Sequence, residues 1–238
     1  MAETGTIVLA LRGVERDYRG LRPLRVRMLE VREGETVALL GLDRAAAEAF
    51  VNLVSGATLP DRGTIETLGR STAAVASNDD WVALLEQVGI LSERTVLLGE
   101  MNVEQNLAMP FSLDLIDLAP ELQWRVAELA MEVGLNTEVL KRPLAALAPL
   151  DLARVRLARA IAGDPRILLA EHPNALVGVA EVSAFGSDLG RVIAGRRLAA
   201  VTLTADAAFA RTVARTTLTH HAATGELAPS TKWRRPFS

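Results

Sequence analysis

The residues with the clearest chemical pattern follow a short apolar stretch. Thr36 to Leu40 is apolar after its first residue, which predicts a strand buried on both faces of a parallel sheet, and Gly41 follows it directly. In phosphate-binding proteins such a junction carries G-x-x-x-x-G-K-[ST]. The glycines let backbone N–H groups surround phosphate, the lysine reaches the outer phosphates, and the hydroxyl holds magnesium. The position of Gly41 therefore indicates phosphate chemistry.

Only the first glycine of that pattern is present. The chain continues in frame with Leu42, Asp43, Arg44, Ala45, Ala46, Ala47, Glu48 and Ala49. Alanine favours helix, and a Cβ resists the φ values that glycine supplies. We therefore predict a helix with Asp43 as N-cap, whose first turn closes the phosphate cradle. An anion near a helix N-terminus is stabilised by roughly 0.3–1 kcal/mol, so we expect Glu48 to satisfy the site without a ligand.

Composition sets the bounds on function. The chain has 238 residues, 50% apolar content, no cysteine and a net charge of −3. These values allow a substantial core, exclude disulfides and thiolate metal sites, and give no bulk attraction to nucleic acid. No apolar run approaches the roughly 20 residues that span a bilayer, and the first residues lack a secretory pattern. We therefore expect a cytoplasmic protein.

Two small clusters are ambiguous. Lys232, Arg234 and Arg235 lie beside Trp233 in a tail, where a solvated end is favoured over a binding patch. The pair His220 and His221 has no partner residue in the sequence that would indicate a metal site.

The elements around the loop are strands and turns. Residues Ile7 to Val14 and Leu24 to Val31 read as strands joined by a polar turn, which contains Tyr18. This tyrosine either stacks on a base or packs at the rim of the turn, and the sequence leaves both readings open. Pro60 to Ile65 predicts a turn into another strand.

In this order and spacing, residues 7 to 228 resemble the nucleotide-binding subunit of an ATP-binding cassette (ABC) transporter. The framework matches of that family are Gly34-Glu35, Leu39-Leu40-Gly41 and Leu59-Pro60-Asp61-x-Gly63. The resemblance implies an α/β fold: a P-loop NTPase-like (RecA-like) parallel-sheet core with an antiparallel β subdomain and an inserted helical subdomain. It implies one domain over 1–238, with a core lobe at 1–93 and 164–228, a helical subdomain at 94–163 and a tail at 229–238.

The resemblance extends to the segment that leads into the helices. In the family a glutamine at the end of a strand touches metal and water, and in Val88-Gly89-Ile90-Leu91-Ser92-Glu93 its position is occupied by Glu93. A carboxylate there would repel a triphosphate, so we interpret Glu93 as a loss. Leu97 to Pro110 resembles the family's "LL…LTV.ENV..P" segment, and Pro120 to Gly134 predicts an amphipathic helix.

The family's LSGGQ signature presents glycines and a helix N-terminus to the nucleotide of the opposite subunit. Here its frame is filled by Leu147, Ala148, Pro149, Leu150 and Asp151. We predict Asp151 as the N-cap of the next helix. Because the glycines are absent and Asp151 adds negative charge, we expect that this face cannot complete a partner's site.

The remaining family positions also differ. Glu171 replaces a magnesium-linked aspartate, and His172 replaces the glutamate that polarises water. A general-base histidine is conceivable, but a structural or solvated histidine is the favoured reading. Ala205 stands where the family has a histidine that contacts the γ-phosphate, and Gly178 stands where it has an aspartate of the dimer contact.

Phosphoryl transfer depends on positioning and charge stabilisation, and the chain lacks the groups that supply them. The positions that depart from the family are Ala47, Glu93, Glu171, His172 and Ala205, so no residue is assigned a catalytic role. The leading hypothesis is a degenerate ABC subunit that pairs with a permease and a second nucleotide-binding subunit, and reaches the inner face of the membrane only through the permease.

Two alternatives remain open. The first is a slow ATPase that uses ATP and magnesium, with Arg44 on phosphate and Glu171 as the metal ligand. The second is a soluble scaffold without a transporter partner.

Overall fold

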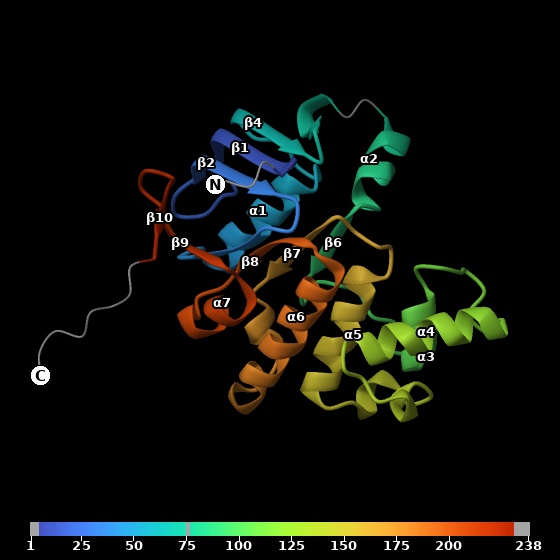
Figure 1. Cartoon of the computed structure of the whole chain (residues 1–238). Helices are drawn as coiled ribbons and strands as arrows, with labels where there is room; N and C mark the ends of the chain where they lie inside the picture. Colours follow the sequence, from blue (N-terminus) through green and yellow to red (C-terminus); the bar gives the residue numbers. More distant parts are fainter. Residues whose placement is uncertain (1–4, 75–76, 231–238) are drawn as a thin grey trace, which may run out of the picture.

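The strands form two sheets in the computed structural model, which describes residues 5–74 and 77–230 (Figure 1). The antiparallel sheet has the order β2 (Leu24–Arg32), β1 (Ile7–Arg16), β4 (Arg62–Thr67) and β5 (Arg70–Ser71). The larger sheet has the order β10 (Glu226–Pro229), β9 (Thr216–His221), β3 (Thr36–Leu40), β8 (Ala199–Leu203), β7 (Ile167–Glu171) and β6 (Val88–Leu91). Neighbouring strands from β9 to β6 are parallel, whereas β10 runs antiparallel to β9.

Helices connect these strands. They are α1 (Arg44–Val54), α2 (Asn78–Leu85), α3 (Val103–Ala108), α4 (Pro120–Glu132), α5 (Pro149–Ile161), α6 (Val182–Arg196) and α7 (Ala207–Val213). Short 3-10 turns lie at Thr72–Ala74, Thr137–Val139, Leu144–Ala146, Pro173–Leu176 and Val179–Glu181. The predicted α/β fold, with a parallel-sheet core and a separate antiparallel sheet, is confirmed.

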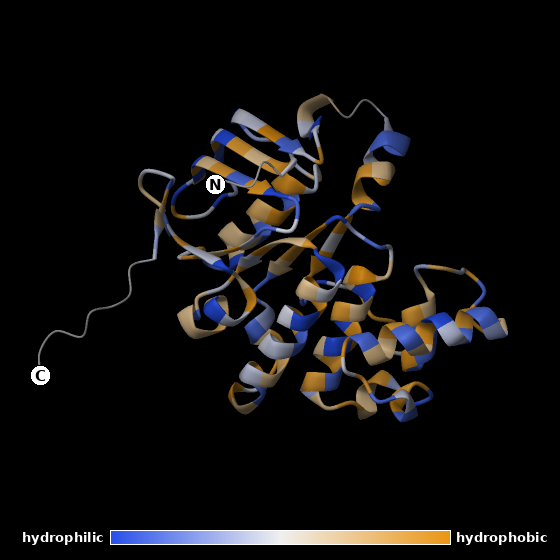
Figure 2. Ribbon diagram, viewed as in Figure 1, coloured by the Kyte–Doolittle hydropathy of each residue, from blue (hydrophilic) through white to orange (hydrophobic). Residues whose placement is uncertain are grey.

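The strand β7 shows how the core is built. Ile167 and Leu169 pack into a hydrophobic cluster with α1 and the antiparallel sheet, whereas Leu168 and Ala170 pack into a second cluster with α5 and α6. Side chains alternate between the two faces of a strand, so β7 is covered on both faces and is apolar up to Glu171. In Figure 2 the central strands are accordingly coloured mostly as hydrophobic.

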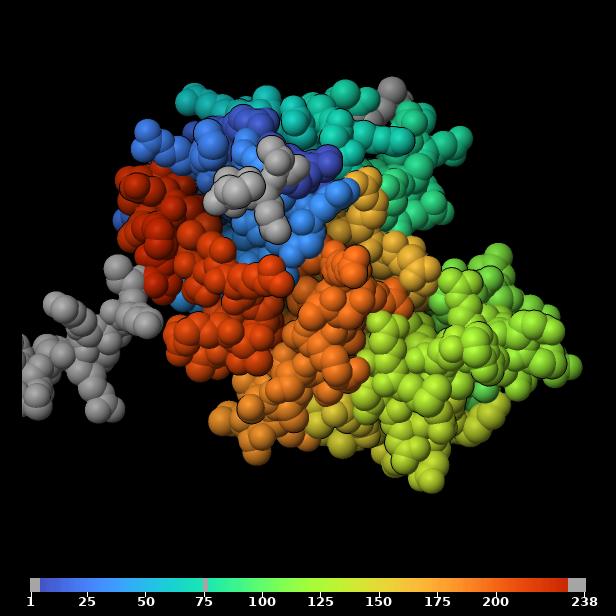
Figure 3. Space-filling model, in the orientation of Figure 1, coloured from blue at the N-terminus to red at the C-terminus, as the bar shows by residue number. Residues whose placement is uncertain are grey.

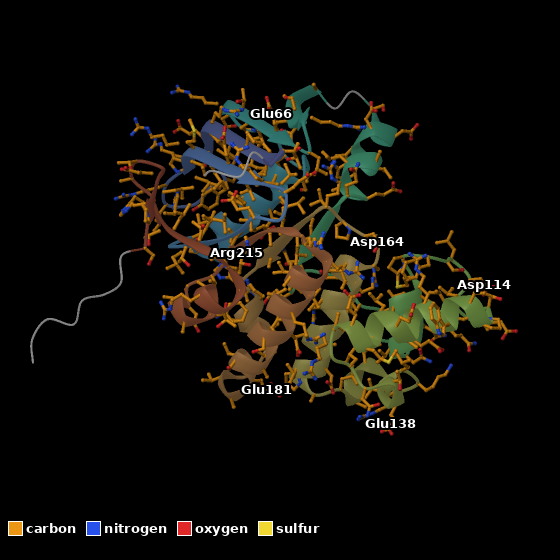
Figure 4. The ribbon with its side chains drawn as sticks, viewed as in Figure 1. Glu66, Asp114, Glu138, Asp164, Glu181 and Arg215 are labelled. Carbon is orange, nitrogen blue, oxygen red and sulfur yellow. The ribbon has the colours of Figure 1, made fainter. Side chains whose placement is uncertain are left out.

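The helices α3 and α4 project from the core on one side (Figure 3). An ion pair fastens this side to α6: Nε and Nη2 of Arg196 donate to the two carboxylate oxygens of Glu132, each at 2.6 Å. Arg196 also donates to Asp164, which is labelled in Figure 4, at 2.9 Å. The predicted subdomain limits, 94 and 163, stay a prediction.

Several predicted boundaries shift. The first two strands extend to Arg16 and Arg32, and the helix predicted to reach Gly134 ends at Glu132. The sequence analysis missed α2, α3, α6, β5 and β10. The basic tail cluster of Lys232, Arg234 and Arg235 lies outside the described residues.

Leu53 on α1 is fully buried between the two sheets, so we expect Leu53→Ala to lower the free energy of unfolding by about 2–5 kcal/mol. Urea unfolding measures the change. Leu113→Ala is the matched control, because Leu113 is fully exposed and its truncation should leave the midpoint unchanged. Equal losses in the two variants would contradict this description of the core.

Candidate functional site

The loop after β3 closes into the start of α1. The carboxylate of Asp43 accepts a hydrogen bond from the backbone N–H of Ala46 at 2.8 Å, which confirms Asp43 as the N-cap. Ala46 and Ala47 are buried in the helix. The backbone that would curve around a phosphate is therefore already helical at these positions.

Gly41 has a packing role at this junction. Its φ is +89°, and a Cβ at this position would lie 2.9 Å from the carbonyl oxygen of His220 on β9. Glycine is required here because the loop passes close to the neighbouring strand in a conformation that other residues rarely adopt.

Glu48 does not sit at the helix N-terminus, contrary to the prediction. It lies beyond the first turn of α1, which has no acidic residue, and the carboxylate at the helix start is that of Asp43. Glu48 instead accepts a hydrogen bond from Nη1 of Arg94 at 3.3 Å. The helix begins at Arg44, and this start places Glu48 too far along for an N-terminal role.

Arg94 also contacts the end of β7. Its Nη2 lies 2.7 Å and its Nε 3.3 Å from the same carboxylate oxygen of Glu171. The side chain of Glu171 is 4% exposed, against 46% for Glu48 and 37% for Arg94. One guanidinium thus joins the two residues that the family resemblance places beside magnesium. The sequence analysis missed Arg94; the only signal was that Glu48 and Glu171 together lacked a cation.

A third ion pair crosses the loop. Arg44 at the start of α1 pairs with Glu93 after β6, and both side chains are partly exposed. The slow-ATPase alternative assigned Arg44 to phosphate. In this structure, the Arg44 guanidinium pairs instead with Glu93, the residue at the family's glutamine position.

His172 is held in an unusual conformation after β7. Its φ and ψ are 44° and 50°, in the left-handed region, and its backbone N–H donates to the carbonyl of Leu203 at 2.8 Å. Its Nε2 is buried and has no hydrogen-bond partner among the described residues. A general base must reach its proton directly or through water, and the buried Nε2 has no described polar partner through which to do so.

The residues after β8 form a cap. Asp206 accepts hydrogen bonds from the backbone N–H groups of Ala208 and Phe209, at 2.8 and 3.0 Å, and so starts α7. Thr204 donates to Asn174 at 2.7 Å. Ala205 lies between Thr204 and Asp206 in the chain and offers no polar side chain.

Asp151 is not an N-cap, and that prediction was wrong. The N-cap of α5 is Ala148, and Pro149 occupies the first helical position, where its fixed φ suits the helix and its missing N–H is not needed. Asp151 therefore lies in the first turn and pairs with Arg154 at 3.1 Å. Leu147 and Leu150 pack against the core. Among the described residues, no hydrogen bond or ion pair joins this segment to the loop after β3.

Tyr18 lies close to the loop. It is partly buried, and its ring folds over Gly20, where an added Cβ would come within 2.5 Å of Tyr18 Cε2. Burial raises the pKa of Tyr18, and the negative charge of Asp43 raises this pKa further. The structure thus supports the rim-packed reading and places the ring near the N-cap of α1.

The two ambiguous histidines differ in environment. Nε2 of His220 lies 2.7 Å from the carbonyl oxygen of Arg25, whereas His221 is exposed.

Across residues 5–74 and 77–230, the structure contains no group of three or more His, Cys, Asp or Glu side chains able to hold a metal ion. In the same ranges, no helix is long and apolar enough to cross a membrane.

Tyr18 is the chain's only tyrosine, so its ionisation can be followed by near-ultraviolet absorbance. We expect a midpoint above the ordinary tyrosine value of about 10. Because the folded-state pKa is raised, this contribution to stability is present below the ordinary value and is lost as pH rises through the raised one. Asp43→Asn keeps a capping oxygen and should lower the midpoint while leaving it above the ordinary value, since burial is the larger cause.

The control for that titration is Asp79→Asn, a change of an exposed aspartate on α2. An equal shift in both variants would mean that Asp43 has no specific effect on Tyr18.

Comparison with known proteins places the chain in a large group. The sequence pattern described as "ABC transporter" matches residues 24–175. The phosphonates import ATP-binding protein PhnC of Anaeromyxobacter dehalogenans is 32% identical over 80% of this chain, and the chain spans 39% of that protein. The macrolide export ATP-binding/permease protein MacB 1/2 of Paracoccus denitrificans is 30% identical over 73% of this chain, which spans 26% of it.

One relative is matched over most of its length. The lipoprotein-releasing system ATP-binding protein LolD 2 of Caulobacter vibrioides is 30% identical over 86% of this chain and 90% of its own sequence. Among solved structures, a dimeric ATP-binding cassette in a post-hydrolysis state with ADP and Pi superposes with a TM-score of 0.75, at 19% identity, over 95% of this chain and 99% of that one. The pattern match and the nearly full-length relative show that this chain is a member of the ABC transporter family, with the fold of its ATP-binding cassette subunits.

Proposed function

We propose that this chain is a catalytically silent cassette subunit of a membrane transporter, which acts by binding other subunits. The single observation that carries the proposal is that two arginines and three carboxylates, joined in three ion pairs, fill the region where the family binds magnesium and phosphate. Arg94 joins Glu48 to Glu171, and Arg44 pairs with Glu93.

ATP with magnesium does not fit the residues present. The Glu171 carboxylate, which would replace the metal-binding aspartate, is engaged by Arg94 and nearly excluded from solvent. The lysine that would reach the outer phosphates is replaced by Ala47, a buried residue of α1. A triphosphate would also meet the carboxylates of Glu48 and Glu93, at a Coulombic cost. The residues present therefore supply no hydrolytic step.

The partners are proposed from the family. Phosphonates import, macrolide export and lipoprotein release appear in the names of relatives, so these relatives include both import and export systems. Two similar solved structures are dimeric cassettes. We propose that this chain pairs with a second cassette subunit and with a permease, and is held at the inner face of the membrane through that permease.

Calorimetric titration with ATP and magnesium, at concentrations that detect millimolar dissociation constants, tests the silent site. We expect no heat of binding, because the ion pairs occupy the site. Caulobacter LolD 2, an ATP-binding protein by name, serves as the positive control. Binding followed by magnesium-dependent turnover that disappears in Glu171→Gln would instead establish the slow-ATPase alternative.

Affinity purification in mild detergent tests the partnership. We expect the full chain to carry an integral membrane protein with it, in a complex that survives gel filtration. Leu113 is a fully exposed residue of the loop between α3 and α4, so Leu113→Ala should keep the fold. This variant shows whether recovery of the membrane protein depends on that loop. Recovery of the chain without a membrane protein under several detergents would favour the scaffold alternative.

A further inference from the structure

Arg94 lies in the segment between β6 and α3 and contacts both α1 and β7. We propose that Arg94 is a tethered cation in the place of a bound metal ion, and that it fixes the segment of residues 92–99 against α1 and β7 without nucleotide. It is a positioning residue. The inference rests on the proposed function, since it takes the site to be one that works without ATP.

The shape of the guanidinium allows one residue to make both contacts. Nε and Nη2 point at Glu171 while Nη1 remains for Glu48, so a single planar group joins β7 to α1. A lysine has one ammonium at the end of a flexible chain and lacks this fixed fork. The nearby pair of Arg44 and Glu93 is already balanced, which leaves Glu48 and Glu171 with Arg94 as their shared cation.

The burial of Glu171 makes the contact with Arg94 important. An ionised carboxylate that is 4% exposed is costly without a partner of opposite charge. Glu48 is half exposed and is solvated in part. Removing the Arg94 side chain therefore destabilises the ionised form of Glu171 more than that of Glu48. It also leaves these two carboxylates without the cation that they share.

Hydrogen bonds hold the segment near both of its ends. The backbone N–H of Arg94 donates to the hydroxyl of Ser92 at 3.1 Å, which shapes the turn after β6. Four residues on, the N–H of Leu98 donates to the side chain of Asn106 at 2.8 Å, and Asn106 donates back to the carbonyl of Leu98 at 3.0 Å. Asn106 is buried on α3. Residues 94–98 thus link the end of β7 to α3, with an ion pair at one end and an amide pair at the other.

Hydrogen exchange of the full-length protein tests the inference. In residues 95–99 the amides of Thr95 and Leu98 donate hydrogen bonds, and in Arg94→Gln we expect these two amides to exchange about tenfold faster or more, while amides of β3 and β8 keep their wild-type rates. Arg16→Gln is the matched control, because Arg16 is similarly exposed and pairs with Asp61 at 2.7 Å on the antiparallel sheet. Wild-type exchange of Thr95 and Leu98 in Arg94→Gln would overturn the inference.

Magnesium chloride without nucleotide tests the replacement of a metal. In Arg94→Gln, millimolar Mg²⁺ should slow exchange of Thr95 and Leu98 towards the wild-type rate, because Glu48 and Glu171 then lack a cation. The wild-type protein should show no response. An equal response in both proteins, or none in the variant, would overturn the metal-replacement part of the proposal.

Two further variants keep the test informative if Arg94→Gln folds poorly. Arg94→Lys retains charge without the fork, and Glu48→Gln changes only the half-exposed partner, so both should give intermediate exchange rates. Unchanged exchange rates in both variants would count against the contact of Arg94 with Glu48 and Glu171.

The two proposals fail in different ways. ATP turnover by the wild-type protein would overturn the proposed function and would not affect the exchange results. Unchanged exchange rates in Arg94→Gln, without ATP turnover by the wild-type protein, would overturn only the role of Arg94.

Discussion

A buried carboxylate imposes the main constraint on this molecule. Glu171 stands at the carboxyl end of β7, in the interior of a sheet that is covered on both faces. A charge so far from water needs a compensating charge close by. Here that charge comes from Arg94, which belongs to the segment between β6 and α3. Arg94 therefore ties the segment that leads into α3 to the end of β7 and, through Glu48, to α1.

The fold itself does not depend on the chemistry of the site. The two hydrophobic clusters lie on opposite faces of the parallel strands and account for the packing of α1, α5 and α6. Burial of apolar surface is the dominant favourable term in folding and does not depend on which polar groups line a loop. A cassette framework can therefore persist while the groups at the strand ends change, and function must be argued from those groups.

The parts of the structure that followed from the sequence are local. The strand Thr36–Leu40, the Asp43 cap and the start of the helix at Pro120 depend on periodicity and on residues within one turn. The errors also have local causes. Pro149 moves the start of α5 ahead of Asp151, and the cap at Asp43 leaves Glu48 beyond the first turn. For α2, Ser77 as cap with acidic residues after it was a usable signal that was overlooked.

The contacts that define the site could not be predicted in the same way. Arg94 reaches Glu48 across 46 positions and Glu171 across 77, and no short-range pattern encodes such pairs. The unusual backbone of His172 and its buried nitrogen likewise result from packing around the strand end. Charge balance was the only available clue, since two acidic replacements at facing positions require a cation from elsewhere in the chain.

Gly41 shows how packing alone can require a residue that also belongs to a binding motif. The carbonyl of His220 leaves no room for a side chain at this position, and the backbone there has a positive φ. Replacement would push β9 away from β3, so purifying selection on folding alone would keep this glycine in a lineage that never meets a nucleotide. A scheme that scores vestigial motifs by residue identity would count it as a trace of ligand binding, although the geometry of the sheet is sufficient to explain it.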